Sequence, residues 1–247
     1  IGIINNNITV AGAIDFADSA NVDLSGDSSI TSTAAGAVTF GTDVDGPFAL
    51  QITNQSGAVT VESVGANDRL DSLSLTSQTS TVTVNGASNT TGPIDIDALD
   101  TATIGGAMDS AAGDIDVTGG DFTTTDTITT TGDINIDAFT NDATIGADVE
   151  SAAGDVDINA EGNVGLGANV IGANVTAQAN AGDVNVTAAL NNTRGGYDFS
   201  AAGDIDVDAD IVADGAIALQ SDTNSDGAAT DLVEISAAAL TAGLDID

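Results

Sequence analysis

The chain of 247 residues contains no cysteine, no histidine and no tryptophan, and its two basic residues are Arg69 and Arg194. The absence of cysteine excludes disulfides and thiolate chemistry. Against the two arginines stand 38 acidic residues, which give a formal net charge of -36. Because nucleic acid binding needs a surface of Lys and Arg, nucleic acid is excluded as a partner, and anionic membrane surfaces are disfavoured for the same reason.

Aromatic residues are also scarce, at 3% of the chain, although apolar residues make up 42%. The apolar fraction therefore comes mainly from Ala, Val, Ile and Leu, which favours a narrow core built from strands. The chain has no apolar run long enough to span a bilayer, so we expect no membrane insertion. Acidity with few aromatics is typical of disorder, but the regular Ile and Val positions described next argue against it.

A five-residue pattern of glycine, aspartate and alternating aliphatic and polar residues recurs along the chain. Its clearest copies begin at Gly113, Gly132, Gly154, Gly182 and Gly203. Looser copies begin at Gly12, Gly36, Gly57, Gly92 and Gly215. Many of the steps from glycine to glycine measure 19 to 22 residues, and a longer one, from 154 to 182, leaves room for a loop. The chain is therefore a repeat protein.

The alternation within each copy predicts a strand with one buried and one solvent-facing side. One such strand cannot bury its own inner side, so successive coils must stack. Helical repeats are disfavoured because the intervening segments are rich in Thr, Gly, Asn and Asp. We predict an all-β, right-handed parallel β-helix (β-solenoid) with about 19 to 22 residues and two or three short strands per coil. We expect residues 1–247 to form a single solenoid segment of a longer repeat protein.

Three features carry a resemblance to a known family: the Gly-Asp repeat, the Ala-Ala-Gly-Asp sequence at 111–114, 152–155 and 201–204, and the segment Leu70–Leu75 ahead of Ser80–Val84. They resemble the coils of filamentous-haemagglutinin-like, two-partner-secreted bacterial surface adhesins, and the resemblance covers most of the chain. It implies an extracellular or cell-surface location and a structural or adhesive role in adhesion or biofilm matrix. A surface glycan or a protein receptor is then the expected partner.

Two other functions compete with this interpretation. A self-assembling filament or sheath subunit would join end to end with copies of itself or with neighbouring solenoid segments. A polysaccharide-active β-helix enzyme would need carboxylates grouped with a base. Because His and Lys are absent and Arg69 and Arg194 are far apart in sequence, we expect no enzymatic activity and no catalytic residues.

Aspartates at the first position after the repeat glycine predict a column on the outer surface. Its members are Asp114, Asp133, Asp155, Asp183 and Asp204. Stacked carboxylates about 5 Å apart repel each other by about 1 kcal/mol in bulk water and by more near a protein surface. Two interpretations remain open: diffuse screening by salt, or a ladder of defined Ca²⁺ sites with oxygen ligands.

A second candidate for Ca²⁺ is the segment at 222–227, where oxygen-bearing side chains alternate ahead of a glycine. Asp222, Asn224 and Asp226 supply the alternating oxygens, and Asp231 stands nearby. The twelfth position is Val233, which is not the glutamate of an EF-hand. The segment is either a shortened Ca²⁺ loop at a coil turn or an ordinary polar turn, and Ca²⁺ is the one cofactor that the sequence suggests.

Overall fold

The computed structural model describes residues 2–4, 6–16, 21–221, 233–235 and 239–243. The chain divides into two compact units, Ile1–Gly120 and Asp121–Asp247. Each unit is a stack of parallel strands, and no helix occurs among the described residues. The units together hold about 10 turns of a β-solenoid with about 21 residues per coil. The predicted fold class is confirmed.

The strands of the first unit are short. They are β1 (Gly2–Ile4), β2 (Ile8–Val10), β3 (Ile14–Asp15), β4 (Val22–Leu24), β5 (Ser28–Ser32), β6 (Val38–Phe40), β7 (Val44–Asp45), β8 (Leu50–Asn54), β9 (Val59–Val61), β10 (Leu73–Ser77), β11 (Val82–Val84), β12 (Ser88–Thr90), β13 (Ile94–Ala98), β14 (Thr101–Ile104), β15 (Met108–Ser110) and β16 (Ile115–Gly119).

The strands of the second unit are also short. Its strands are β17 (Asp121–Thr124), β18 (Ile128–Thr130), β19 (Ile134–Ala138), β20 (Ala143–Ile145), β21 (Val149–Ser151), β22 (Val156–Ala160), β23 (Val164–Leu166), β24 (Val170–Ile171), β25 (Asn174–Ala179), β26 (Val184–Val186), β27 (Leu190–Asn192), β28 (Gly196–Ala201), β29 (Ile205–Val207), β30 (Ile211–Ala213), β31 (Ile217–Gln220), β32 (Val233–Ile235) and β33 (Leu240–Ala242).

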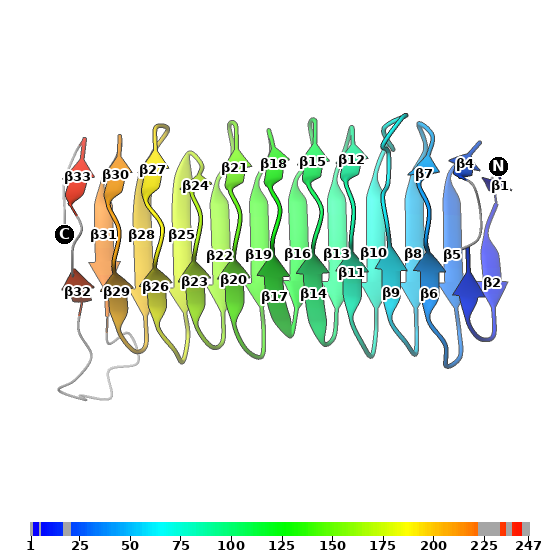
Figure 1. The fold of residues 1–247 in the computed structure, drawn as a ribbon, viewed down its shortest axis with the longest axis horizontal. Coiled ribbons are helices and arrows are strands. Elements are labelled where there is room, and N and C mark those ends of the chain that lie inside the picture. The colour runs from blue at the N-terminus through cyan, green and yellow to red at the C-terminus, as the bar shows by residue number, and fades with distance from the viewer. Residues whose placement is uncertain (1, 5, 17–20, 222–232, 236–238, 244–247) are drawn as a thin grey trace. The chain divides into compact units, whose positions relative to one another are not determined.

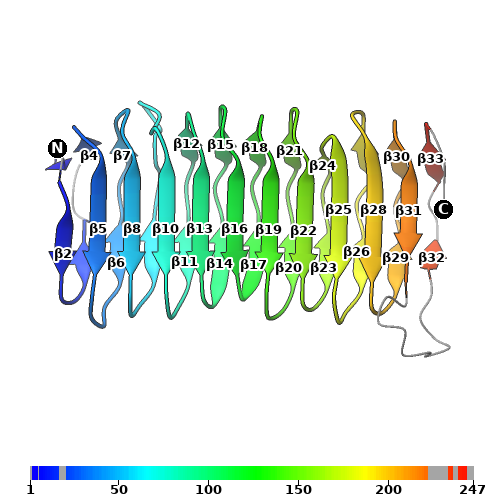
Figure 2. The ribbon, with the colours of Figure 1, turned by 180° about the vertical axis from the view of Figure 1, so that it is seen from behind.

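The strands of the first unit line up in three rows, and most coils contribute one strand to each row. The first row is β2-β5-β8-β10-β13-β16, the second is β3-β6-β9-β11-β14, and the third comprises β1-β4-β7 and β12-β15. Figure 2 shows the longer first-row strands of this unit side by side, with β6, β11 and β14 of the second row behind them.

The second unit repeats this plan. Its first row is β19-β22-β25-β28-β31, its second row is β17-β20-β23-β26-β29-β32, and its third row comprises β18-β21-β24 and β27-β30-β33. Along the chain a third-row strand is followed by a first-row strand and then by a second-row strand, as β21, β22 and β23 are in Figure 1. A coil with three strands agrees with the predicted two or three.

Register places like residues above like residues, which is what fills the narrow core. Leu73 pairs with Ile94 and Ile94 pairs with Ile115, and all three are buried. Burying an aliphatic side chain of this size contributes about 1.5 to 3 kcal/mol. Two of the few aromatic residues, Tyr197 and Phe199, lie in this core with their ring centres 5.4 Å apart. The Tyr197 hydroxyl donates to the Val170 carbonyl at 2.8 Å.

Buried polar side chains close the ends of several strands, and the sequence analysis missed them. In the first row of the first unit, Ser32 pairs with Asn54 and Asn54 pairs with Ser77. The Ser77 hydroxyl donates to the Gly57 carbonyl at 2.8 Å, and the Asn54 amide donates to the Gly36 carbonyl at 2.9 Å. The turn carbonyls thus give these buried side chains the hydrogen-bond partners that a buried polar group needs. The available signal was a polar residue at an inward position, directly before a turn.

The sequence suggested a loop in the long step from Gly154 to Gly182, but the structure has strands there. Gly154 precedes β22 of the first row, whereas Gly182 precedes β26 of the second row, and the residues between them form β23, β24 and β25 as well as β22. Both rows need the same alternation of inward and outward residues, so the same pentapeptide serves either. The clearest copies of the repeat therefore belong to two different rows.

Candidate functional site

Aspartate and asparagine side chains lie at the start of many strands and form ladders in the second unit, including one in each of the first and second rows. The second-row ladder consists of Asp121, Asp142, Asn163, Asp183 and Asp204 at the starts of β17, β20, β23, β26 and β29. The first-row ladder consists of Asp133, Asp155 and Asn174 at the starts of β19, β22 and β25. The paired strands place members of each ladder on successive coils.

Each ladder is held by hydrogen bonds from the backbone of one coil to a side chain of the coil before it. In the second-row ladder, the Asn163 N–H donates to Asp142 Oδ1 at 2.7 Å, the Asp183 N–H donates to Asn163 Oδ1 at 2.9 Å, and the Asp204 N–H donates to Asp183 Oδ1 at 2.8 Å. Because Asp and Asn both offer this oxygen, they interchange along the ladder. The side chain acts as the cap residue of a helix does, by accepting an N–H that starts an element.

The first-row ladder has the same chemistry. The Asp155 N–H donates to Asp133 Oδ1 at 2.9 Å, and the Asn174 N–H donates to Asp155 Oδ1 at 3.0 Å. A Cβ atom on Gly154 would collide with the Asp133 carboxylate, which explains why glycine precedes aspartate in the repeat. The Gly-Asp pair is thus one structural device.

The predicted single aspartate column is wrong in its register. Asp114, Asp133 and Asp155 precede first-row strands, whereas Asp183 and Asp204 precede second-row strands. Asp155 is followed on the next coil of its row by Asn174, and not by Asp183. The charge repulsion that motivated bound cations is therefore shared between two ladders, and backbone N–H donors partly offset it.

The predicted cation sites stay predictions. Among the residues that the structure describes, no group of three or more His, Cys, Asp or Glu side chains is arranged to hold a metal ion. The proposed Ca²⁺ loop residues Asp222, Asn224, Asp226 and Asp231 lie outside the described residues.

The two arginines each bind a third-row carboxylate in their own unit. Arg69 forms an ion pair with Asp109 of β15 through both terminal nitrogens. Arg194 donates to the Glu150 carboxylate at 2.6 Å and to the Ser151 carbonyl at 3.0 Å, both on β21. The partners are 40 and 44 residues apart, which is about two coils. Each arginine therefore ties together coils that are not directly adjacent.

Carboxylates outside the ladders also face each other on the first row of the first unit. Asp95 of β13 pairs with Asp116 of β16. Partial burial raises the pKa of the Asp95 carboxyl above its ordinary value, the charges of Asp116 and Asp97 raise it further, and a hydrogen bond from Ser74 opposes the shift.

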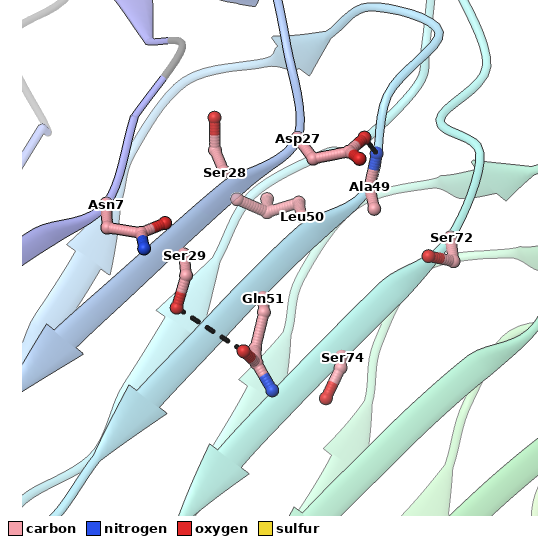
Figure 3. Close-up of a pocket in the computed structure, with 9 residues that line it drawn as sticks. All are labelled: Asn7, Asp27, Ser28, Ser29, Ala49, Leu50, Gln51, Ser72 and Ser74. Atoms are coloured by element: carbon pink, nitrogen blue, oxygen red, sulfur yellow. Dashed lines mark hydrogen bonds between the residues drawn. The ribbon is translucent and has the colours of Figure 1, made fainter.

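The first-row strands before β13 carry uncharged residues at their outward positions instead. A hollow with a volume of about 310 Å³ lies over β5, β8 and β10. Figure 3 shows the residues that line it. Its polar lining includes Asn7, Ser29, Gln51, Ser72 and Ser74, with Asp27 at one side. Ser29 pairs with Gln51 and Gln51 pairs with Ser74 on successive strands. No sequence signal marked this hollow, because it depends on side chains that come together only through the coil register.

The outer surface next to the hollow is also built of neutral side chains in register. Thr31 pairs with Thr53 and Thr53 pairs with Thr76 along the first row. In the second row, Thr39, Thr60, Thr83 and Thr103 are stacked in the same way. Thr suits this position because a β-branched side chain packs well on a pleated surface. Two rows of the first unit thus carry repeated hydroxyl groups.

No protein-family model, curated protein or solved structure matches the chain. Within the described part of the chain, no helix has the length and apolar character needed to cross a membrane. The structure shows a parallel β-solenoid. The resemblance to filamentous-haemagglutinin-like adhesins is a hypothesis about function.

Proposed function

We propose that the chain is an extracellular structural and adhesive scaffold of a bacterial cell surface or biofilm matrix, of the filamentous-haemagglutinin-like kind. Its solenoid units would hold attachment surfaces in a fixed geometry. Its outer faces would bind a surface glycan or a protein receptor through contacts that recur from coil to coil.

The observation that supports this proposal most is the repetition of side chains across stacked coils. The ladder residues Asp142, Asn163 and Asp183 link each coil to the next through hydrogen bonds between side chain and backbone. Such links act between neighbouring coils, so each added coil contributes its own share of stability, as expected of a solenoid scaffold. Identical outward residues, such as Thr60 and Thr83, repeat on the same stack and favour multivalent attachment.

A shear assay tests the adhesive role. Beads coated with the folded chain would be passed over a printed panel of neutral glycans, acidic glycans and extracellular matrix proteins. Beads coated with the urea-unfolded chain carry the same charge and serve as the matched control. We expect retention of the folded-chain beads on at least one surface. Equal retention of folded and unfolded coats on every surface would contradict the adhesive role.

The competing functions predict different results in solution. A filament or sheath subunit would show continuous growth of sedimentation coefficient with concentration, because each added copy extends the stack. A polysaccharide-active enzyme would release reducing ends from a polysaccharide substrate. Either result would replace the proposed scaffold with that alternative.

A further inference from the structure

The hollow on the first row of the first unit is a concave, mostly uncharged surface in a strongly acidic chain. Figure 3 shows Ser29, Gln51 and Ser74 projecting from three adjacent strands, with Asn7 beside Ser29. The buried side chain of Leu50, which is 1% exposed, contributes an apolar part of the lining. A concave surface with convergent polar groups is one feature of ligand sites, because the polar groups fix the orientation of the ligand.

The Ser74 hydroxyl donates to Asp95 Oδ2 at 3.5 Å, and the other polar groups of the hollow keep hydrogen-bonding capacity for a ligand. The Ser29 hydroxyl donates to Gln51 Oε1 at 3.3 Å, so this oxygen is held while the Gln51 amide nitrogen has no acceptor among the described residues. Gln51 is exposed. The Asp27 carboxylate accepts the Ala49 N–H at 3.1 Å, which fixes its position at the side of the hollow. The lining therefore offers hydroxyl and amide groups, which both donate and accept hydrogen bonds.

The distribution of charge around the hollow favours an uncharged ligand. The outward positions in register with Gln51 are Ser29 and Ser74, and those in register with Thr53 are Thr31 and Thr76, all uncharged. Carboxylates begin on the next coil, at Asp95 and Asp97 of β13. An anionic ligand would meet these carboxylates and Asp27, together with the net charge of -36, whereas an uncharged one would not be repelled.

The spacing of the polar groups favours an extended ligand with a repeating structure. Neighbouring strands of the row are about 4.8 Å apart, so polar groups recur across the hollow at that interval. This interval is close to the length of one sugar residue in an extended polysaccharide. A chain of sugars lying across the strands would meet Ser29, Gln51 and Ser74 with successive residues.

We propose that this hollow binds an uncharged polysaccharide, which lies across β5, β8 and β10 and exchanges hydrogen bonds with Ser29, Gln51 and Ser74. The proposal deepens the adhesive function and rests on it, because it names the class of ligand. Each contact is weak and exposed, so binding of a short oligosaccharide would be weak and would strengthen with length as further coils take part.

The test is to titrate the full chain with two neutral hexasaccharides, cellohexaose and mannohexaose, and to monitor binding by NMR chemical shifts. We expect one of them to shift the signals of Ser29, Gln51 and Ser74, and hexagalacturonate, an anionic chain of equal length, to bind more weakly. Gln51→Ala should weaken binding about five-fold, as expected for the loss of one hydrogen bond. Gln51→Glu, which keeps the size and adds a charge, should weaken it as well.

Gln55→Ala is the matched control, because Gln55 is an exposed glutamine in the turn after the same strand and does not line the hollow. The absence of shifts with both neutral sugars, or equal binding by the Gln51 and Gln55 variants, would overturn the proposal. Tighter binding of hexagalacturonate, with or without Ca²⁺, would overturn it too. If Gln51→Ala beads still adhere normally in the shear assay, the hollow is not the site but the adhesive function stands; if wild-type beads adhere to nothing, the adhesive function fails first.

Discussion

Replacing Asp183 with alanine tests whether the ladder residues act as backbone caps. Asp183 Oδ1 accepts the Asp204 N–H at 2.8 Å. Removing this acceptor loses a charge-assisted hydrogen bond worth about 1.5 to 3 kcal/mol. It also relieves repulsion between Asp183 and Asp204, which is about 1 kcal/mol for carboxylates one strand spacing apart in water. We therefore expect Asp183→Ala to destabilise the local structure by about 0.5 to 2 kcal/mol.

Hydrogen exchange at the Asp204 amide measures this effect where it acts. A local loss of about 1.4 kcal/mol raises the exchange rate about ten-fold if the amide opens locally. Position 183 is distant in sequence from 204, so the intrinsic exchange rate of that amide is unchanged. Asp183→Asn keeps the acceptor oxygen, as Asn163 does naturally for the Asp183 N–H, and should leave exchange close to the wild-type rate.

Asp206→Ala is the control, because it removes a charge at an outward position of β29, on the same coil as the Asp204 amide. Its effect on the Asp204 amide should be much smaller than that of Asp183→Ala. Unchanged exchange in Asp183→Ala would refute the capping role. Exchange as fast in Asp183→Asn as in Asp183→Ala would show that charge, and not the hydrogen bond, is what matters.

Three further predictions concern the core, the pH dependence and the cations. Ser88 is fully buried and its hydroxyl has no hydrogen-bond partner among the described residues, so Ser88→Ala should raise the free energy of unfolding by about 1 kcal/mol in urea titrations; a loss of stability would contradict this. The pKa of Asp95 is raised in the folded state, so its charged form costs stability at neutral pH, and this cost disappears as pH falls through the raised pKa toward the ordinary value of 3.8. Asp95→Asn should therefore be more stable than the wild type at neutral pH, with a margin that shrinks on acidification; a margin that grows would show the opposite shift. If Ca²⁺ occupies defined sites, the melting temperature should be higher in millimolar Ca²⁺ than in EDTA at fixed ionic strength, whereas equal values would favour diffuse screening.

Much of the fold was predictable because alternation is a local property. The sequence pattern predicts that Ile115 and Val117 face inward, and both side chains are buried. Coil length followed from the spacing of repeat glycines, since each coil must return to the same row. The parallel stack then follows from the need of each strand to be covered.

The row to which each repeat belongs was not predictable in the same way. Gly154 and Gly182 begin nearly identical pentapeptides, yet they lead into different rows. A Gly-Asp pair and an alternating strand satisfy either row, so nothing local in the pentapeptide names its row. The assignment depends on the residues between copies, where three strands were present and a loop was expected.

The candidate site was harder still. The hollow around Gln51 depends on which residues stand beside it on the coils before and after, Ser29 and Ser74, and these are about 22 residues away in either direction. The buried hydroxyl of Ser77 was missed for a similar reason, because its acceptor is a turn carbonyl of the preceding coil. Both features arise from register.

Register is therefore the claim on which the ladders, the neutral rows and the proposed site all depend, and a pair of nitroxide labels tests it most directly. The chain has no native cysteine, so double-cysteine variants label cleanly. The structure pairs Asn185 with Asp206 on adjacent coils of the second row and places Asp157 in the first row. Labels at 185 and 206 should show strong dipolar broadening in frozen solution, and labels at 157 and 185 should show much less. Strong broadening for 157 and 185, with none for 185 and 206, would contradict the account.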